Sequence, residues 1–342
     1  MRKMLTLGML MVLFTYFVPM YGNGFSWSEP LPFLQAATAD FAGEKEKIAR
    51  TTADLTMESG KIAVLADGEL QTLPLETYVA GVVAAEVSPD FPEAALQAQA
   101  VAARTYAVYK QRMGRPAQHA EADVCDDPGH CTAYLDLAVE ASAAWGTQAS
   151  AYEDAIVRAV NATAGQIVTY EGSPIIAVFS AAAAGRTESA VDVWGSDIPY
   201  LVSVKSGGET ACPGYRDSVT FSADKFRAMV QQALPSADLS GAPNTWFTEE
   251  KRSDAGGVVT VNLGGAAVRG STVRTIAGLR STHYTLETTE ESLTFITEGY
   301  GHGVGLSQWG ARQMALDGAD YKTILTHYYQ GTTVSNLQDL SV

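Results

Sequence analysis

Glu86 is the residue whose position points most directly to acid–base chemistry. The sequence predicts a short helix that Pro74 opens and that Pro89 and Pro92 end. Glu86 closes an apolar stripe on that helix, with the spacing of 3.6 residues per turn: Leu75, Tyr78, Val79 and Val82. A carboxyl group among apolar neighbours has a raised pKa, because desolvation disfavours its charged form, and such a group suits a general acid near neutral pH. The structural alternative is a carboxylate that bonds to nearby backbone or pairs with an arginine on the next helix.

Arg104 is the cation that this second helix offers. The Ala-rich segment 93–110 lacks Gly and Pro and predicts a helix on which Gln97, Val101 and Arg104 share a face. Arg104 can pair with Glu86 or bind an anionic group of a substrate through two hydrogen bonds. The spacing does not decide between the two roles.

Four potential metal ligands lie within a polar loop at 114–130 and the residue after it. His119, Cys125, His130 and Cys131 have the spacing His-x5-Cys-x4-His-Cys. Two thiolates and two imidazoles form a tetrahedral set that suits zinc, and a closed site of this kind is structural. A Cys125–Cys131 disulfide is the alternative, since the compartment is expected to be oxidising. Cys212 is left over and is expected to be a buried or unpaired thiol.

A glycine-rich loop, Gly301-His302-Gly303-Val304-Gly305, precedes a helix predicted at 306–317. Glycines allow a backbone to approach a ligand closely, and a helix start at Leu306 would favour an anion. The spacing and the lysine of a phosphate-binding P-loop are absent, which argues against a nucleotide site. The following Ser307-Gln308-Trp309 offers hydrogen bonds and a ring face for a sugar.

The remaining pattern mixes strands and helices without a regular βαβ alternation, which predicts an α+β fold. Residues 61–73 read as a hairpin with a turn at Asp67-Gly68, and residues 137–164 as mostly helical. Residues 206–217 and 253–257 read as surface loops. The other predicted strands lie at 166–170, 175–179, 258–263 and 293–297, and a last helix at 321–329.

The N-terminus predicts export across a membrane. Residues 1–22 read as a membrane anchor, with Arg2 and Lys3 before an apolar run that is just long enough to span a bilayer, and the basic residues place the remainder outside the cytoplasm. A cleaved signal peptide is the alternative. Residues 23–58 read as a stalk, and residues 59–342 as the folded region, with two subdomains as one option.

Composition restricts the partners. A net charge of −15, with 46% hydrophobic and 18% charged residues, describes a folded acidic protein. Binding to nucleic acid is not expected, since that requires a basic surface. An anionic polymer would have to be attracted by local groups.

Four segments together resemble the stage II sporulation protein D family, which includes the amidase-enhancer proteins. They are Leu73–Glu86, Ala98–Tyr106, Asp123–Cys131 and Gly301–Gly310, and a fifth, Gly185–Glu188, fits less closely. The resemblance covers residues 61–332. The chain departs from the family pattern at Gln97, where lysine is usual, and at Ala181–Ala184, where serine and glycine are usual, so contacts with substrate are expected to differ there.

The resemblance implies a peptidoglycan lytic transglycosylase that acts on peptide-stripped glycan strands during sporulation, with Glu86 as acid and base. It implies a structural zinc on the His/Cys cluster, a single-pass membrane anchor with the catalytic region extracytoplasmic, and a companion amidase and membrane scaffold protein as partners. A substrate cleft is expected, and the residues predicted to line it are Arg104, Tyr106, Glu188, His302, Gly303, Ser307 and Gln308.

Three other functions compete with this one. Glu188 could act with Glu86 as a second carboxylate, which would make the protein a hydrolase. The chain could be a non-catalytic module that activates a peptidoglycan amidase. A zinc amidase is disfavoured, because it would need an open coordination position. A free lactyl carboxylate on the stripped glycan would need a local site, for which Arg104 and the helix start at Leu306 are the candidates.

Overall fold

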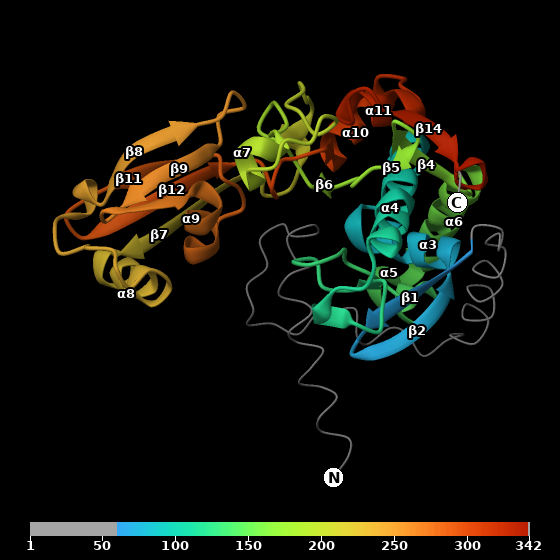
Figure 1. The fold of residues 1–342 in the computed structure, drawn as a ribbon, viewed down its shortest axis with the longest axis horizontal. Helices are drawn as coiled ribbons and strands as arrows, with labels where there is room; N and C mark the ends of the chain where they lie inside the picture. Colours follow the sequence, from blue (N-terminus) through green and yellow to red (C-terminus); the bar gives the residue numbers. More distant parts are fainter. Residues whose placement is uncertain (1–59, 341–342) are drawn as a thin grey trace, which may run out of the picture.

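The computed structural model describes residues 60–340 and contains two lobes (Figure 1). The second lobe, residues 216–298, is inserted between two halves of the first and lies at the left of Figure 1. Each lobe has its own apolar core. The fold is α+β, as predicted, because short sheets and helices mix in both lobes. The predicted anchor at 1–22 and stalk at 23–58 lie outside the described residues.

The first half of the main lobe begins with the predicted hairpin. Strands β1 (Lys61–Ala66) and β2 (Glu69–Pro74) pair antiparallel, and both turn residues have positive φ, 51° at Asp67 and 77° at Gly68. A short strand that the sequence did not reveal, β3 (Val124–Cys125), pairs parallel with β1. The cluster-bearing loop is thereby fixed to the edge of the hairpin.

Four helices pack behind this sheet. Helices α3 (Leu75–Glu86) and α4 (Glu93–Met113) follow the predicted stretches, and α5 (Leu137–Trp145) and α6 (Ala149–Ala162) occupy the predicted helical segment. Helix α4 is central, since it contacts α3, α6, α10 and α11. Its Ala-rich faces allow close approach on all sides, because small side chains leave little volume between helix axes.

The second half of the main lobe closes around the other side of α4. Strand β4 (Gln166–Tyr170) pairs with β5 (Ser173–Pro174) and with β14 (Thr333–Asn336), and β6 (Phe179–Ser180) pairs parallel with β13 (Leu306–Ser307). The strand predicted at 175–179 is wrong, because only its last residue is in a strand. The helices here are α7 (Ala190–Trp194), α10 (Gln308–Leu316) and α11 (Tyr321–Tyr328).

The second lobe forms a folded unit with an apolar core of its own. Its sheets have the orders β11-β12-β7 and β10-β9-β8, and two helices cover an aromatic core around Phe226, Trp246 and Phe295. Most of its elements were not predicted from the sequence. They are β7 (Arg216–Ser222), α8 (Ala223–Ala233), β8 (Phe247–Arg252), β9 (Val258–Leu263), β10 (Ala266–Arg269), α9 (Gly270–Ala277), β11 (Tyr284–Thr288) and β12 (Ser292–Glu298).

Within residues 60–340, no helix combines the length and apolar character that a bilayer crossing requires.

Candidate functional site

Glu86 is the last residue of α3, and the residue as a whole is partly buried. The helix ends there because Val87 is extended and Pro89 follows. The apolar stripe that precedes Glu86 is buried as predicted, with Tyr78, Val79 and Val82 at 1% exposure or less. The stripe fixes the helix against the core and leaves Glu86 at its edge.

Both carboxylate oxygens of Glu86 have a protein donor. The backbone N–H of Ala133 donates to Oε1 at 3.0 Å, and the Nε2 of Gln308 donates to Oε2 at 3.5 Å. Burial nevertheless raises the pKa of Glu86 to about 7, and the two hydrogen bonds oppose this rise only in part. The predicted raised pKa is confirmed. A carboxyl group with this pKa exists in both protonation states near neutral pH, so it can give and take a proton.

Gln308 brings the glycine-rich segment to Glu86. It is the first residue of α10, and its side chain reaches across from the opposite end of the chain. The predicted helix start at Leu306 is wrong by two residues, because Leu306 and Ser307 form β13. Ser307 caps the helix by accepting a hydrogen bond from Gly310 N at 3.2 Å, and it donates to Glu209 at 2.8 Å. Ser307 is 1% exposed, so neither it nor the capped helix start is an open anion site.

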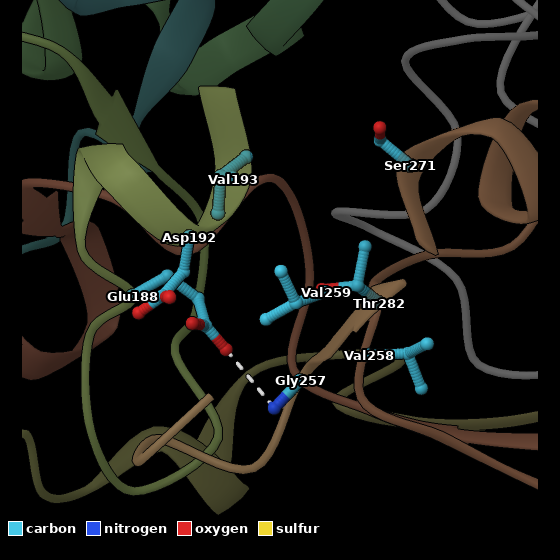
Figure 2. A pocket seen from close by; sticks show the side chains of 8 residues that line it. All are labelled: Glu188, Asp192, Val193, Gly257, Val258, Val259, Ser271 and Thr282. Atoms are coloured by element: carbon cyan, nitrogen blue, oxygen red, sulfur yellow. Dashed lines mark hydrogen bonds between the residues drawn. The ribbon is translucent and has the colours of Figure 1, made fainter. Parts of the chain in front are cut away.

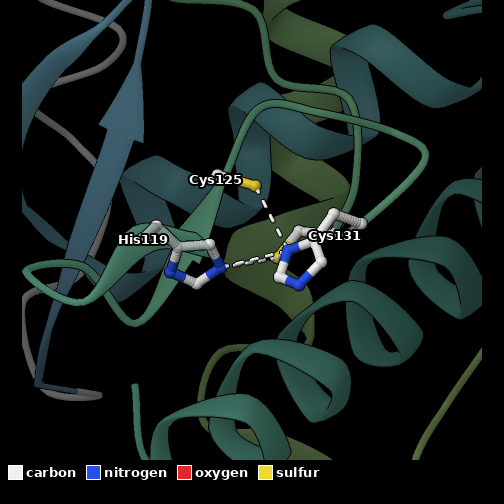
Figure 3. Close-up of side chains that lie close together, drawn as sticks. His119, Cys125 and Cys131 are labelled. Atoms are coloured by element: carbon white, nitrogen blue, oxygen red, sulfur yellow. Dashed lines mark hydrogen bonds between the residues drawn. The ribbon is translucent and has the colours of Figure 1, made fainter. Parts of the chain in front are cut away.

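The four predicted metal ligands converge (Figure 3). His119 Nε2 lies 3.2 Å from His130 Nδ1, and Cys131 Sγ lies 3.4 Å from each of these nitrogens. Cys125 Sγ lies 3.6 Å from His130 Nδ1. A tetrahedral zinc with ordinary bond lengths has ligand separations of about 3.3 Å between nitrogens and about 3.5 Å between nitrogen and sulfur. The side chains therefore fit a four-coordinate metal ion.

Two further features suit a metal site. Cys125 and Cys131 are not joined by a disulfide, and Cys212 is a buried free thiol as expected. The outer nitrogen of His119, Nδ1, lies 2.8 Å from the carbonyl of Ala122. Because a carbonyl only accepts, Nδ1 carries the proton and Nε2 presents its lone pair to the cluster.

The cluster is connected to Glu86 through only two residues. Cys131 is followed by Thr132, whose hydroxyl lies 2.9 Å from the hydroxyl of Tyr78 on α3. The next residue is Ala133, which donates to Glu86. Residues that hold Cys131 in place thus also set the position of the amide that contacts the acid.

The ring that the sequence indicated at Trp309 belongs to an aromatic and cationic group whose other members, Phe91 and Arg312, were not predicted. Phe91, in the turn after α3, packs edge-on against Trp309 at 5.2 Å between ring centroids. The guanidinium of Arg312 lies over both rings, at 5.7 Å and 5.1 Å from their centroids. Arg312 follows Gln308 by four residues, so the two side chains lie on the same face of α10. That i, i+4 spacing was the available signal.

The substrate role predicted for Arg104 is wrong. Arg104 is 0% exposed and forms a bidentate ion pair with Glu76, with Nε donating to both carboxylate oxygens at 2.9 Å and 3.0 Å. Its Nη1 donates to the carbonyl of Gln166 at 3.0 Å. Arg104 therefore joins α3, α4 and β4 inside the core and contacts neither Glu86 nor solvent.

The structure also contradicts the substrate role predicted for Glu188. Its side chain is 2% exposed, accepts from Gly257 N at 3.1 Å and lies 2.6 Å from His283 Nε2. The hydrogen bonds lower its pKa despite burial. The cavity beside it holds only about 10 Å³, room for about one water molecule (Figure 2). Glu188 therefore joins the main lobe to the second lobe.

The remaining residues predicted to bind substrate are His302, Gly303 and Tyr106, and each contacts other protein groups. His302 packs against Trp194 at 5.3 Å, accepts a hydrogen bond from Val304 N at 3.0 Å, and burial lowers its pKa to about 4. Gly303 accepts from Glu188 N at 2.8 Å and has a φ of 76°. Tyr106 is 9% exposed, and its hydroxyl donates to the carbonyl of His130 at 3.5 Å. Tyr106 thus supports the metal-ligand loop, and only Gln308 of the predicted set contacts Glu86.

Comparisons with known proteins show which family the chain belongs to. Residues 67–170, which contain α3, α4 and the His/Cys cluster, match the family model for stage II sporulation protein. Stage II sporulation protein D of Bacillus subtilis is 33% identical over 314 residues, 89% of this chain and 90% of that protein. The protein of that name from Bacillus amyloliquefaciens is 35% identical over 78% of this chain and 75% of its own length. The chain therefore belongs to the stage II sporulation protein D family.

A more distant relative is the amidase enhancer of Bacillus subtilis. It is 27% identical over 75% of this chain, but the match spans 40% of that protein. The resemblance to this branch, inferred above from the motifs, is thus also found by whole-sequence comparison.

Proposed function

We propose that the protein is a peptidoglycan lytic transglycosylase that cleaves between MurNAc and GlcNAc during sporulation, with Glu86 as its acid and base. One observation carries the proposal: Glu86 has a pKa of about 7 and both of its oxygens are held by protein donors. The family membership agrees with a role in sporulation.

Glu86 performs both proton transfers. Its protonated form gives the proton to the glycosidic oxygen, and the bond from that oxygen to C1 of MurNAc breaks. The resulting carboxylate is stabilised by the N–H of Ala133 and by Gln308. It then removes the proton from the C6 hydroxyl of the same sugar. That oxygen bonds to C1, which yields a 1,6-anhydro end without consuming water.

A one-carboxylate reaction suits this site better than hydrolysis. Burial is the largest cause of the raised pKa, and no neighbouring carboxylate within residues 60–340 contributes to it. Glu188, the predicted partner, is engaged by His283 and Gly257. Ordinary glycosidases use two carboxylates that face each other across the bond.

Arg312 is the residue that we expect to hold the lactyl carboxylate of a peptide-stripped MurNAc. Arg104 and the α10 start, the original candidates, are buried or capped. Arg312 is partly exposed, shares a face with Gln308, and has no carboxylate partner among the ion pairs of the described residues.

Arg312→Gln should reduce the preference for stripped over peptide-bearing glycan, while Arg112→Gln, an exposed change of equal charge on α4, should not. An unchanged preference in both variants contradicts this assignment.

The His/Cys cluster is proposed to hold a structural zinc. His119, Cys125, His130 and Cys131 supply all four ligands, so no coordination position is left for catalysis. The ion would supply folding energy to the loop that ends at Ala133. Residues 1–22 are proposed to anchor the protein in the cell membrane with the described region outside the cytoplasm. A companion amidase and a membrane scaffold protein are the proposed partners.

The second candidate function is activation of a peptidoglycan amidase, favoured by the similarity to the amidase enhancer. The full chain and E86Q should be incubated with peptide-stripped strands alone, and separately with intact peptidoglycan and an amidase. We expect glycan fragments from the wild type alone and none from E86Q. Stimulation of the amidase without any glycan cleavage by the wild type would make the activator the better account.

A further inference from the structure

A second pocket lies apart from Glu86, between α10, α11 and the segment that leads toward the second lobe. It has a volume of about 480 Å³, within the usual range for small-ligand sites, which is about 300–1,000 Å³. Its lining includes Arg186, Lys205, Ser206, Met314, His327 and Tyr328. Neither Glu86 nor the residues that contact it line this pocket.

The charge of the pocket is opposite to that of the protein. Arg186, Lys205 and His327 line it, and no Asp or Glu in the described part of the chain does, although the chain has a net charge of −15. Arg186 and Lys205 also face each other across an isolated antiparallel bridge. Side chains directly opposite in such a bridge project to the same face, and like charges there repel.

Neither cation has a compensating carboxylate among the described residues. The ion pairs found within residues 60–340 involve neither Arg186 nor Lys205. Arg186 is held instead by neutral groups, since its Nε donates to Ser203 Oγ and its Nη2 to the Ser203 carbonyl, both at 3.2 Å. These bonds orient the guanidinium without neutralising it.

The other polar side chains of the pocket are hydrogen-bonded and do not repel an anion strongly. His327 Nε2 lies 2.7 Å from the Lys205 carbonyl, so it is the protonated nitrogen of the ring. Ser206 and Tyr328 form the floor, with their hydroxyls 2.7 Å apart. The acid behind them, Glu209, accepts from Ser206, and burial raises its pKa to about 7, so it is partly neutral near pH 7.

We propose that this pocket is a binding site for an oxyanion of a cell-wall polymer. The oxyanion is either a carboxylate or a phosphate. Arg186 and Lys205 supply the charge, and the bound anion relieves the repulsion between them. Two sources share this chemistry: the lactyl carboxylate of a muramic sugar and the phosphodiester of a polymer such as poly(glycerol phosphate). The inference goes beyond the proposed function and does not require that the protein cleave glycan.

The test is a calorimetric titration of the full chain, in detergent and at fixed ionic strength, with three probes: N-acetylmuramic acid, inorganic phosphate and poly(glycerol phosphate). The double variant Arg186→Gln/Lys205→Gln should weaken binding at least tenfold. The matched control Lys251→Gln/Lys322→Gln removes two charges from exposed positions outside the pocket and should change binding less than twofold. Lys205→Gln alone, whose side chain is exposed, should weaken binding severalfold and guards against a folding defect in the double variant.

The outcomes separate the sources and can refute the site. Tighter binding of N-acetylmuramic acid that the pocket pair of substitutions weakens assigns the pocket to the glycan strand. Tighter binding of phosphate or its polymer that the same pair weakens assigns it to a phosphodiester. The proposal is overturned if none of the probes binds, or if the control pair weakens binding as much as the pocket pair. Because the readout is binding, a protein without transglycosylase activity would still give a clear result.

Discussion

Replacing Glu86 by glutamine should stabilise the protein in a pH-dependent way. The pKa of Glu86 is about 7 in the folded protein, against a reference value of 4.5. The folded state therefore holds this proton more tightly than the unfolded state does. Well below pH 4.5 the carboxyl group is protonated in both the folded and the unfolded state, so it does not change the free energy of unfolding. As the pH rises from 4.5 to 7, only the unfolded state ionises fully, so the wild type loses stability through that window.

The size of the effect follows from the shift. The difference between a pKa of about 7 and the reference value of 4.5 corresponds to about 3 kcal/mol of unfolding free energy. Because Glu86 is partly exposed, solvent screens the unfavourable burial of its charge. We therefore expect E86Q to increase the free energy of unfolding by about 1–3 kcal/mol at high pH. A glutamine keeps an oxygen for the Ala133 N–H and avoids the charge. Glu209 also has a raised pKa, but it is present in both proteins and cancels in the difference.

The assay is calorimetric unfolding of wild type and E86Q between pH 4 and pH 8, with the two lobes analysed separately if they unfold separately. The two melting temperatures should coincide at pH 4, and E86Q should melt about 2–10 °C higher at pH 8. Glu290→Gln, an exposed change in the turn between β11 and β12, should match the wild type throughout. Equal pH profiles for E86Q and wild type would refute the raised pKa and with it the argument for an acid poised near neutrality.

Three other predictions concern groups that hold the site. Arg104→Gln removes the guanidinium that pairs with Glu76 in the core and should cost about 3–5 kcal/mol of unfolding free energy, measured by denaturant titration; a loss below about 1 kcal/mol contradicts the buried pair. Purified protein should contain one zinc per chain, and chelation should lower its melting temperature, whereas Cys125→Ser/Cys131→Ser should contain none and be insensitive to chelator. Gly310→Ala places a methyl group against the hydroxyls of Tyr328 and Ser206 and should cost about 1–3 kcal/mol, while Gly207→Ala, in open space, should be neutral.

Local patterns predicted the elements around Glu86 well. The hairpin, α3 and α4 carry turn residues, prolines and apolar periodicity, which act over a few residues. The elements that these signals predict are present in the structure. The His/Cys cluster was also predictable, because its four ligands are close in sequence and their chemistry is restrictive.

Long-range contacts were not predictable in the same way. Periodicity predicted the face of α4 on which Arg104 lies, but not whether that face is buried. Its partner Glu76 lies 28 residues away on another helix. Glu188 looked like a free carboxylate because its partner His283 is 95 residues distant. Most of the second lobe escaped detection because a strand such as β7, although its burial alternates, buries only one side chain fully and so carries little apolar pattern.

The most direct test of the account is the mass of the products that the full chain releases from peptide-stripped glycan strands. We predict muramic ends that lack one water molecule, formed by the wild type and by Glu290→Gln and absent with E86Q. Ordinary reducing ends, carrying the added water, would contradict a single-carboxylate transglycosylase and would require a second group to activate water.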